Sequence, residues 1–155
     1  EQAAVWSYPV TEDCTGDDVS DDRIVMNMIN SFLGRMHLAS HLERLNDRQL
    51  ALIADGVAYY NSLTPMKKRA LPYFPNGFTG FGADHVCAGL RDGDKICLAV
   101  WNMGETGQVR AKIPGIRDVR VGYPAVTDTT VTLSDDELIV EFPRKCMAVF
   151  LEIEV

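Results

Sequence analysis

Two hydrophobic periods follow one another in this chain, and their order limits the folds open to it. Residues 20–63 carry apolar side chains at the spacing of a helix pair. From residue 81 onward, apolar and polar side chains alternate in short runs, which is the period of half-buried strands. The chain also begins at Glu1 without an initiator Met, and we expect it to be the end of something larger.

The first helix is expected to begin at Ser20, with Asp21 and Asp22 next to the positive end of the helix dipole. Apolar side chains then cover most of the helix circumference over residues 23–45, which indicates burial on more than one side. We expect this helix to pack against a domain outside these residues. The alternative is an ordinary core helix of a compact domain.

The second helix has a clear start signal. Asn46 is the expected N-cap, and Gln49 stands three residues later, as in a capping box. Leu45 and Leu50 flank this start as a hydrophobic staple. Pro65 is expected to end the helix, because proline cannot continue it.

Six alternating segments predict an antiparallel β-sandwich with one face on the core and the other in water. They cover residues 86–90, 96–101, 109–113, 119–121, 138–142 and 147–155. The fold class is therefore α+β. Within the strands, Trp101 is expected in the core and Phe150 is the candidate for an outward-facing aromatic ring.

The segment 64–82 links the helices to the strands and carries aromatic residues among prolines. Its aromatic members are Tyr73, Phe74, Phe78 and Phe81. We expect them to pack across a domain junction; the alternative is a strip on which carbohydrate stacks.

Charge and cysteine content restrict the partners. The net charge is −7, and the only basic run is Lys67-Lys68-Arg69, which argues against nucleic acid or an anionic membrane surface. No apolar stretch is long enough to span a bilayer. The four cysteines, with no CxxC pair among them, are Cys14, Cys87, Cys97 and Cys146.

Cys87 and Cys97 flank a predicted two-residue turn at Asp92-Gly93, which would set Cys87 opposite Leu98 and point the two thiols to opposite faces. We therefore expect all cysteines to be reduced, as in the cytoplasm.

No set of residues predicts catalysis, a metal site or a cofactor. His37 and His41 are four apart on the predicted first helix, a zinc-ligand spacing, but the glutamate of a zincin is missing. We prefer structural histidines there. The acidic residues fall in predicted loops and helix starts, and no phosphate loop, dinucleotide fingerprint or nucleophile elbow occurs.

Six segments carry a resemblance to a known family. They are residues 1–9 (EQAAVWSYP), 27–30 (NMIN), 33–42 (LGRMHLASHL), 53–60 (IADGVAYY), 70–75 (ALPYFP) and 98–102 (LAVWN). Together they resemble the C-terminal stretch of glycoside hydrolase family 36, the α-galactosidase or melibiase-like enzymes. The resemblance covers nearly the whole chain through packing motifs, not catalytic ones.

This resemblance implies that residues 1–66 are the last helical unit of a truncated (β/α)₈ barrel and residues 67–155 a C-terminal antiparallel β-sandwich. It implies a retaining hydrolase of terminal α-galactosides whose two catalytic aspartates lie upstream, so no Asp here takes those roles. Trp6 and Tyr8 would then border the substrate mouth, with a purely structural role as the alternative.

The implied partners are the N-terminal and barrel domains of the parent enzyme, its carbohydrate substrate and further copies in a homo-oligomer. The implied location is the bacterial cytoplasm. The alternative function is a standalone carbohydrate-binding or oligomerisation module.

Overall fold

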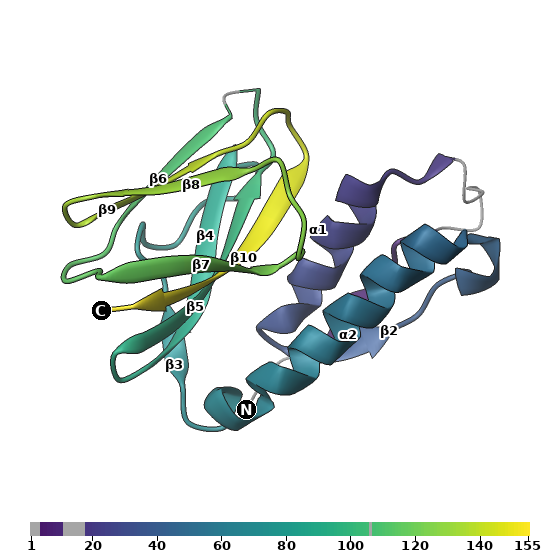
Figure 1. Cartoon of the computed structure of the whole chain (residues 1–155), viewed down its shortest axis with the longest axis horizontal. Helices are drawn as coiled ribbons and strands as arrows, with labels where there is room; N and C mark the ends of the chain where they lie inside the picture. Colours follow the sequence, from purple (N-terminus) through teal and green to yellow (C-terminus); the bar gives the residue numbers. More distant parts are fainter. Residues whose placement is uncertain (1–3, 11–17, 106) are drawn as a thin grey trace.

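The computed structural model describes residues 4–10, 18–105 and 107–155, which form a helical layer, a five-stranded sheet and a three-stranded sheet (Figure 1). The elements are β1 (Ala4–Ser7), α1 (Asp21–Phe32), β2 (Arg35–Leu38), the 3₁₀ turn η2 (Leu42–Arg44), α2 (Asp47–Lys67), β3 (Leu71–Tyr73), β4 (His85–Asp92), β5 (Lys95–Asn102), β6 (Gln108–Lys112), β7 (Asp118–Tyr123), β8 (Thr130–Ser134), β9 (Glu137–Glu141) and β10 (Met147–Glu154). The predicted α+β class is confirmed, and the two larger sheets are antiparallel as predicted, whereas the two-stranded sheet β1–β2 is parallel.

The first part of the chain is a β-α-β unit. β1 and β2 pair in parallel, with Val5 opposite Met36, and α1 is the crossover between them. The predicted helix over residues 23–45 is therefore wrong in its second half. α1 stops at Phe32, just before Gly34, and the apolar side chains that follow alternate along a strand.

The apolar surface of α1 is covered by this chain itself. Ile24, Met28 and Phe32 are fully buried, and α1 packs against β1, α2 and β10. The alternative of an ordinary core helix is correct, and the expectation that another domain covers α1 is wrong. The apolar side chains of α1 are covered by β1 and α2 as well as by β10 of the sandwich.

Both helix starts are as predicted. Ser20 accepts a hydrogen bond of 3.2 Å from the Arg23 amide, and Asn46 and Gln49 exchange reciprocal hydrogen bonds of 3.0 Å in a capping box. The predicted end of the second helix is wrong, because Pro65 lies inside α2. A proline in the last turn removes only one helical hydrogen bond, and α2 ends two residues later at Lys67.

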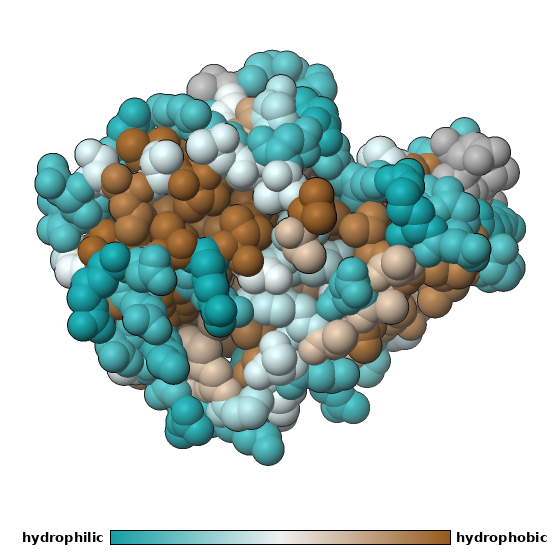
Figure 2. Space-filling model, viewed as in Figure 1, coloured by the Kyte–Doolittle hydropathy of each residue, from teal (hydrophilic) through white to brown (hydrophobic). Residues whose placement is uncertain are grey.

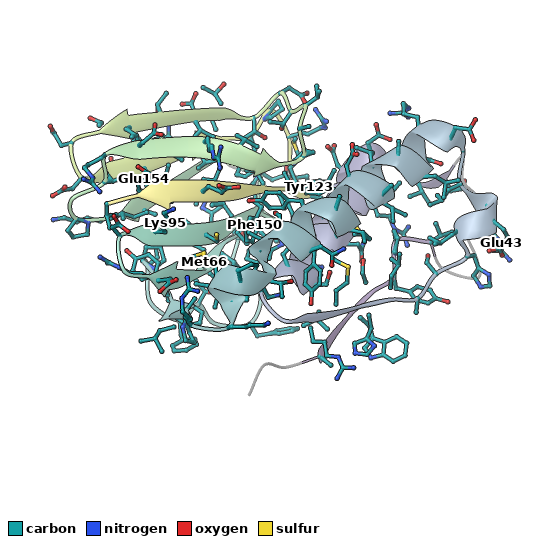
Figure 3. The ribbon with its side chains drawn as sticks, turned by 60° about the horizontal axis from the view of Figure 1, so that its bottom comes forward. Glu43, Met66, Lys95, Tyr123, Phe150 and Glu154 are labelled. Atoms are coloured by element: carbon teal, nitrogen blue, oxygen red, sulfur yellow. The ribbon has the colours of Figure 1, made fainter. Side chains whose placement is uncertain are left out.

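The sandwich is made of two antiparallel sheets, β3-β4-β5-β10-β7 and β6-β9-β8. Alternate residues of β10 enter two different cores: Leu151 lies between the sheets, whereas Phe150 lies against the helices. Figure 3 shows Phe150 and Tyr123 between the sheet and α2. The prediction that Phe150 points outward is therefore wrong. The prediction that one side of this sheet faces water is wrong too, because the helical layer covers that side. Trp101, expected in the core, is half-buried and donates a hydrogen bond of 2.8 Å to Asn30.

The β4–β5 hairpin turns one residue later than predicted. Asp92 pairs with Lys95, so Gly93 and Asp94 form the loop and Cys87 lies opposite Val100. The prediction that the two thiols point to opposite faces is confirmed, because Cys87 faces the other sheet and Cys97 the helices. Cys14 lies outside the described residues.

The loop after β3 exposes aromatic rings. Phe74 and Phe78 pack with ring centroids 4.3 Å apart, but Phe78 is 87% exposed and Phe81 is fully exposed. The prediction that Phe78 and Phe81 pack across a junction is therefore wrong within the described chain. Figure 2 shows further apolar side chains at the surface over the sandwich, ringed by hydrophilic residues. None of the described helices has the length and apolar character needed to cross a membrane.

Candidate functional site

The parallel pair β1–β2 has one covered and one open face. Ser7 and Met36 point to the helices: the Ser7 hydroxyl donates 3.0 Å to the Asn27 carbonyl, and Met36 packs on the helical core. Because side chains alternate along a strand, Trp6 and His37 lie on the opposite face. Trp6 is 67% exposed there. This open face is the candidate functional site.

Trp6 and His37 stand directly opposite each other in the strand register. Their rings stack with centroids 5.7 Å apart and planes 19° apart. The stack joins two residues far apart in the sequence because β1 and β2 are parallel neighbours. The sequence reading placed His37 on a helix and so missed this contact; the strand-like alternation after Gly34 is the signal that points to it.

The carboxyl ends of β1 and β2 are tied together by Ser40. Its hydroxyl accepts a hydrogen bond of 2.8 Å from the Val10 amide and donates one of 2.9 Å to the Val10 carbonyl. Val10 itself is fully buried. The Ala39 amide also donates 3.0 Å to the Ser7 carbonyl. Tyr8, which is 37% exposed, lies in the sequence between Ser7 and Val10, the two residues that these bonds hold. The two predicted substrate-binding residues, Trp6 and Tyr8, are thus close in the chain at one held strand end.

The described histidines do not make a zinc pair. His37 is on β2, whereas His41 precedes η2 and its Nδ1 lies 3.0 Å from a Glu43 carboxylate oxygen. A backbone hydrogen bond and then the contact with His41 lower the pKa of Glu43. Within the described ranges, no three His, Cys, Asp or Glu side chains gather as a metal site would require.

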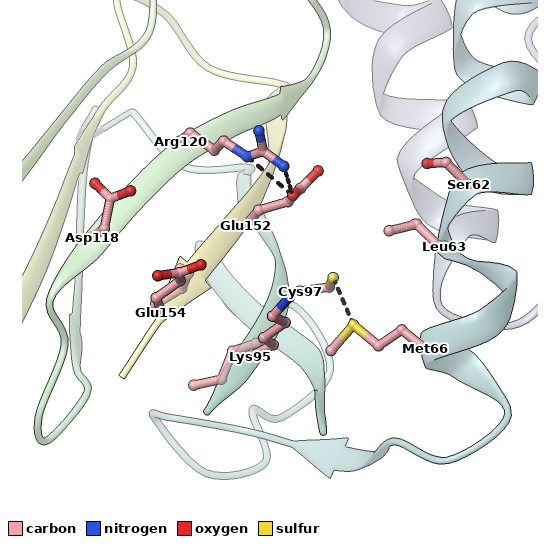
Figure 4. Close-up of a pocket in the computed structure, with 11 residues that line it drawn as sticks. Ser62, Leu63, Met66, Lys95, Cys97, Asp118, Arg120, Glu152 and Glu154 are labelled. Carbon is pink, nitrogen blue, oxygen red and sulfur yellow. Dashed lines mark hydrogen bonds and ion pairs between the residues drawn. The ribbon is translucent and has the colours of Figure 1, made fainter. Parts of the chain in front are cut away.

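A second hollow lies between α2 and the five-stranded sheet, with a cavity of about 530 Å³ (Figure 4). Glu152 lines this hollow and accepts hydrogen bonds of 2.8 Å from the Tyr59 hydroxyl and 3.0 Å from Arg120 Nε. On its floor the Cys97 sulfur lies 3.2 Å from the Met66 sulfur. Burial raises the pKa of Cys97 to about 12, so the thiol is neutral and is no nucleophile at ordinary pH.

A third hollow, of about 690 Å³, lies where α1 meets the sandwich. Arg144 bridges it, with Nε 2.6 Å from Asp22 and Nη1 2.9 Å from Asp128. The hydrogen bond from Arg144 lowers the pKa of Asp128. In both hollows the charged groups named here are engaged with one another: Arg120 pairs with Glu152 within one sheet, and Arg144 joins α1 to the sandwich.

Comparison with known proteins defines the fold but not a family. No protein-family model and no curated protein sequence matches the chain. Among solved structures, the α-amylase of Geobacillus thermoleovorans complexed with acarbose is similar over 98% of this chain and 39% of its own, at 12% identity and a TM-score of 0.64. An Anoxybacillus α-amylase is similar over 86% of this chain and 32% of its own, at 9% identity and a TM-score of 0.59.

The α-amylase of H. orenii is similar over 88% of this chain and 36% of its own, at 10% identity and a TM-score of 0.50. The chain therefore spans 32–39% of the length of these enzymes. At such low identity the likeness concerns the fold alone. The class it defines is plain: this is a fold that occurs within glycoside hydrolase chains.

Proposed function

We propose that this chain is the C-terminal part of an α-galactosidase-like retaining glycoside hydrolase of family 36, acting on terminal α-linked galactosides. Residues 1–66 would be the last helical unit of its truncated (β/α)₈ barrel, and residues 67–155 its C-terminal sandwich. In this proposal the chain is inactive alone, because both catalytic aspartates lie upstream of it.

The open face of β1–β2 is the observation that carries the proposal. Parallel strands occur almost only where both faces of the sheet are covered. Here helices cover one face, while Trp6 on the other is 67% exposed. A β-α-β unit followed by α2 is the repeating pattern of a (β/α)₈ barrel, and further barrel strands would cover this face and pair with the free edges of β1 and β2.

The family resemblance of residues 1–9 and 33–42 gives the α-galactosidase class, and both segments include one of the paired strands. Active sites of such barrels lie at the carboxyl ends of the strands. Trp6 and Tyr8 are near that end of β1, which supports their place at the substrate mouth. The reduced thiols, bacterial cytoplasmic location, lack of nucleic-acid or membrane partners, and homo-oligomer all stay predictions.

Two other functions have one observation each. The likeness to α-amylases, at TM-scores of 0.64 and 0.59, favours hydrolysis of α-glucosides. The exposed rings of Phe78 and Phe81 favour a standalone carbohydrate-binding or oligomerisation module. Against the module, the inward Phe150 leaves the described strands of the sandwich without the aromatic platform expected there.

The test is to determine the gene sequence upstream of Glu1, express the whole polypeptide and assay it on p-nitrophenyl α-galactoside, α-N-acetylgalactosaminide and α-glucoside. We expect galactoside hydrolysis, with the α-anomer as first product by NMR, and none from the 155-residue chain alone. A preference for the glucoside would move the proposal to the amylase class. A start codon directly before Glu1 would remove the barrel and favour the binding module.

A further inference from the structure

The indole of Trp6 is held on one side and open on the other. His37 stacks on one of its faces, with ring planes 19° apart, yet Trp6 remains 67% exposed. No side-chain hydrogen bond engages either ring among the residues that the structure describes. The ring contact of the indole within the described chain is the stack with His37.

The pair occupies a level of the sheet that suits ligand binding. Counting along β1 and β2, Ala4 and Arg35 form the first pair on the open face, and Trp6 and His37 form the second. This second pair is the last one on that face before the strands end at Ser7 and Leu38. In a (β/α)₈ barrel the side chains at this level border the substrate site.

The chemistry of a flat aromatic ring with one open face matches a sugar. A pyranose has an apolar C–H side that packs on an aromatic ring, and binding sites combine such surfaces with few polar groups. An indole already fixed from behind loses less conformational freedom when the ligand arrives, which improves affinity.

We propose that His37 is a positioning residue that holds the Trp6 indole as a stacking platform for a pyranose ring of the substrate. This inference rests on the proposed function and adds a role for His37 to it. His37 acts through Trp6, so its removal weakens substrate binding and leaves the chemical step in place.

The experiment compares variants of the whole polypeptide on p-nitrophenyl α-galactoside. For His37→Ala we expect KM to rise about two- to tenfold, the range of an aromatic pair, with kcat within about twofold. Trp6→Ala should raise KM at least as much. His37→Phe restores a stacking ring and should return KM to near the wild-type value. The matched control is His85→Ala, which removes a histidine from β4 of the sandwich.

Two results overturn the inference while leaving the proposed function intact. One is an unchanged KM in His37→Ala; the other is a His37→Phe enzyme as weak as the alanine variant. If instead no α-glycoside is hydrolysed, the proposed function fails, and titration with methyl α-galactoside decides the inference. A change in tryptophan emission that vanishes in Trp6→Phe and shrinks in His37→Ala supports it, and no change in the wild type overturns it.

Discussion

The hydroxyl of Tyr59 on α2 occupies the space that a Cβ on Gly122 of β7 would need. Tyr59 cannot easily move away, because its hydroxyl donates a hydrogen bond of 2.8 Å to Glu152, which also binds Arg120. Burial, followed by this hydrogen bond, raises the pKa of Tyr59 far above its usual value, so the phenol stays neutral. The glycine is thus required by the packing of the helical layer on the sheet.

Gly122→Ala is expected to destabilise the chain by about 1–3 kcal/mol, the usual cost of overpacking. Chemical denaturation followed by circular dichroism measures the change. Gly80→Ala is the matched control, since a Cβ there meets no atom within 4 Å, and its effect should stay within about 0.5 kcal/mol. Equal effects of the two variants would show that the Tyr59 side chain moves aside at little cost in stability.

Phe150→Ala is expected to cost about 3–5 kcal/mol, because it opens a cavity among packed rings. Phe150 is fully buried and lies 5.3 Å, centroid to centroid, from Phe32 on α1. Phe78→Ala removes the same side chain from an 87% exposed position and should change stability by less than about 0.5 kcal/mol. The two unfolding curves, measured in urea, should therefore separate clearly; overlapping curves would contradict the packing described.

Ser40→Ala is expected to cost about 1–3 kcal/mol, since it leaves the amide and carbonyl of the buried Val10 without the partner described here. Hydrogen exchange of the Val10 amide should speed up as well. Ser62→Ala serves for comparison, because the Ser62 hydroxyl is exposed and donates only to the Tyr59 carbonyl. If Val10 exchanges at the same rate in Ser40→Ala and the wild type, the bond does not hold the strand ends.

The thiols should differ in reactivity. Burial raises the pKa of both Cys87 and Cys97 to about 12, whereas Cys146 is exposed. Alkylation by iodoacetamide at mildly alkaline pH, followed by mass spectrometry, should therefore modify Cys146 well before the other two. Labelling of Cys97 as fast as Cys146 would show that the helical layer opens readily from the sheet.

The same shifts link stability to pH. In the unfolded chain a thiol ionises near about 8.5. Because the folded pKa values of Cys87 and Cys97 are higher, their contribution to stability is complete below that pH and is lost as pH rises toward 12. The loss is at most about 1.4 kcal/mol per pH unit for each thiol. Urea unfolding at neutral pH and near pH 9.5 (roughly one unit above the unfolded pKa) measures it, and a Cys87→Ala/Cys97→Ala variant should lose less.

Local signals in the sequence predicted the local structure well. The caps at Ser20 and Asn46 and the alternation in most sandwich strands depend on neighbours in the chain, and the structure has them where expected. β8 was missed although Val131 and Leu133 alternate there with polar Thr and Ser side chains, because the strand is only five residues long and carries just two apolar residues.

The errors concern contacts between distant segments. The residues of β2 were assigned to a helix because the alternation after Gly34 spans only four residues and its partner strand, β1, lies far earlier in the chain. Phe150 was placed outside because a single strand does not reveal that a helix covers its second face. The Trp6–His37 stack depends on the first of these pairings, so only Trp6 and Tyr8 could be proposed from sequence, and those through resemblance.

Phe150 and Leu151 are neighbours in β10, yet they belong to different cores. Successive side chains of this strand therefore pack alternately against the helices and against the second sheet. A recombination event that exchanged residues 67–155 for a foreign sandwich would bring new side chains against Phe32 and Tyr59, and both are fitted to this one. We therefore expect residues 1–66 and 67–155 to be inherited as one unit. In homologues, substitutions in β10 should be accompanied by compensating substitutions in α1 and α2.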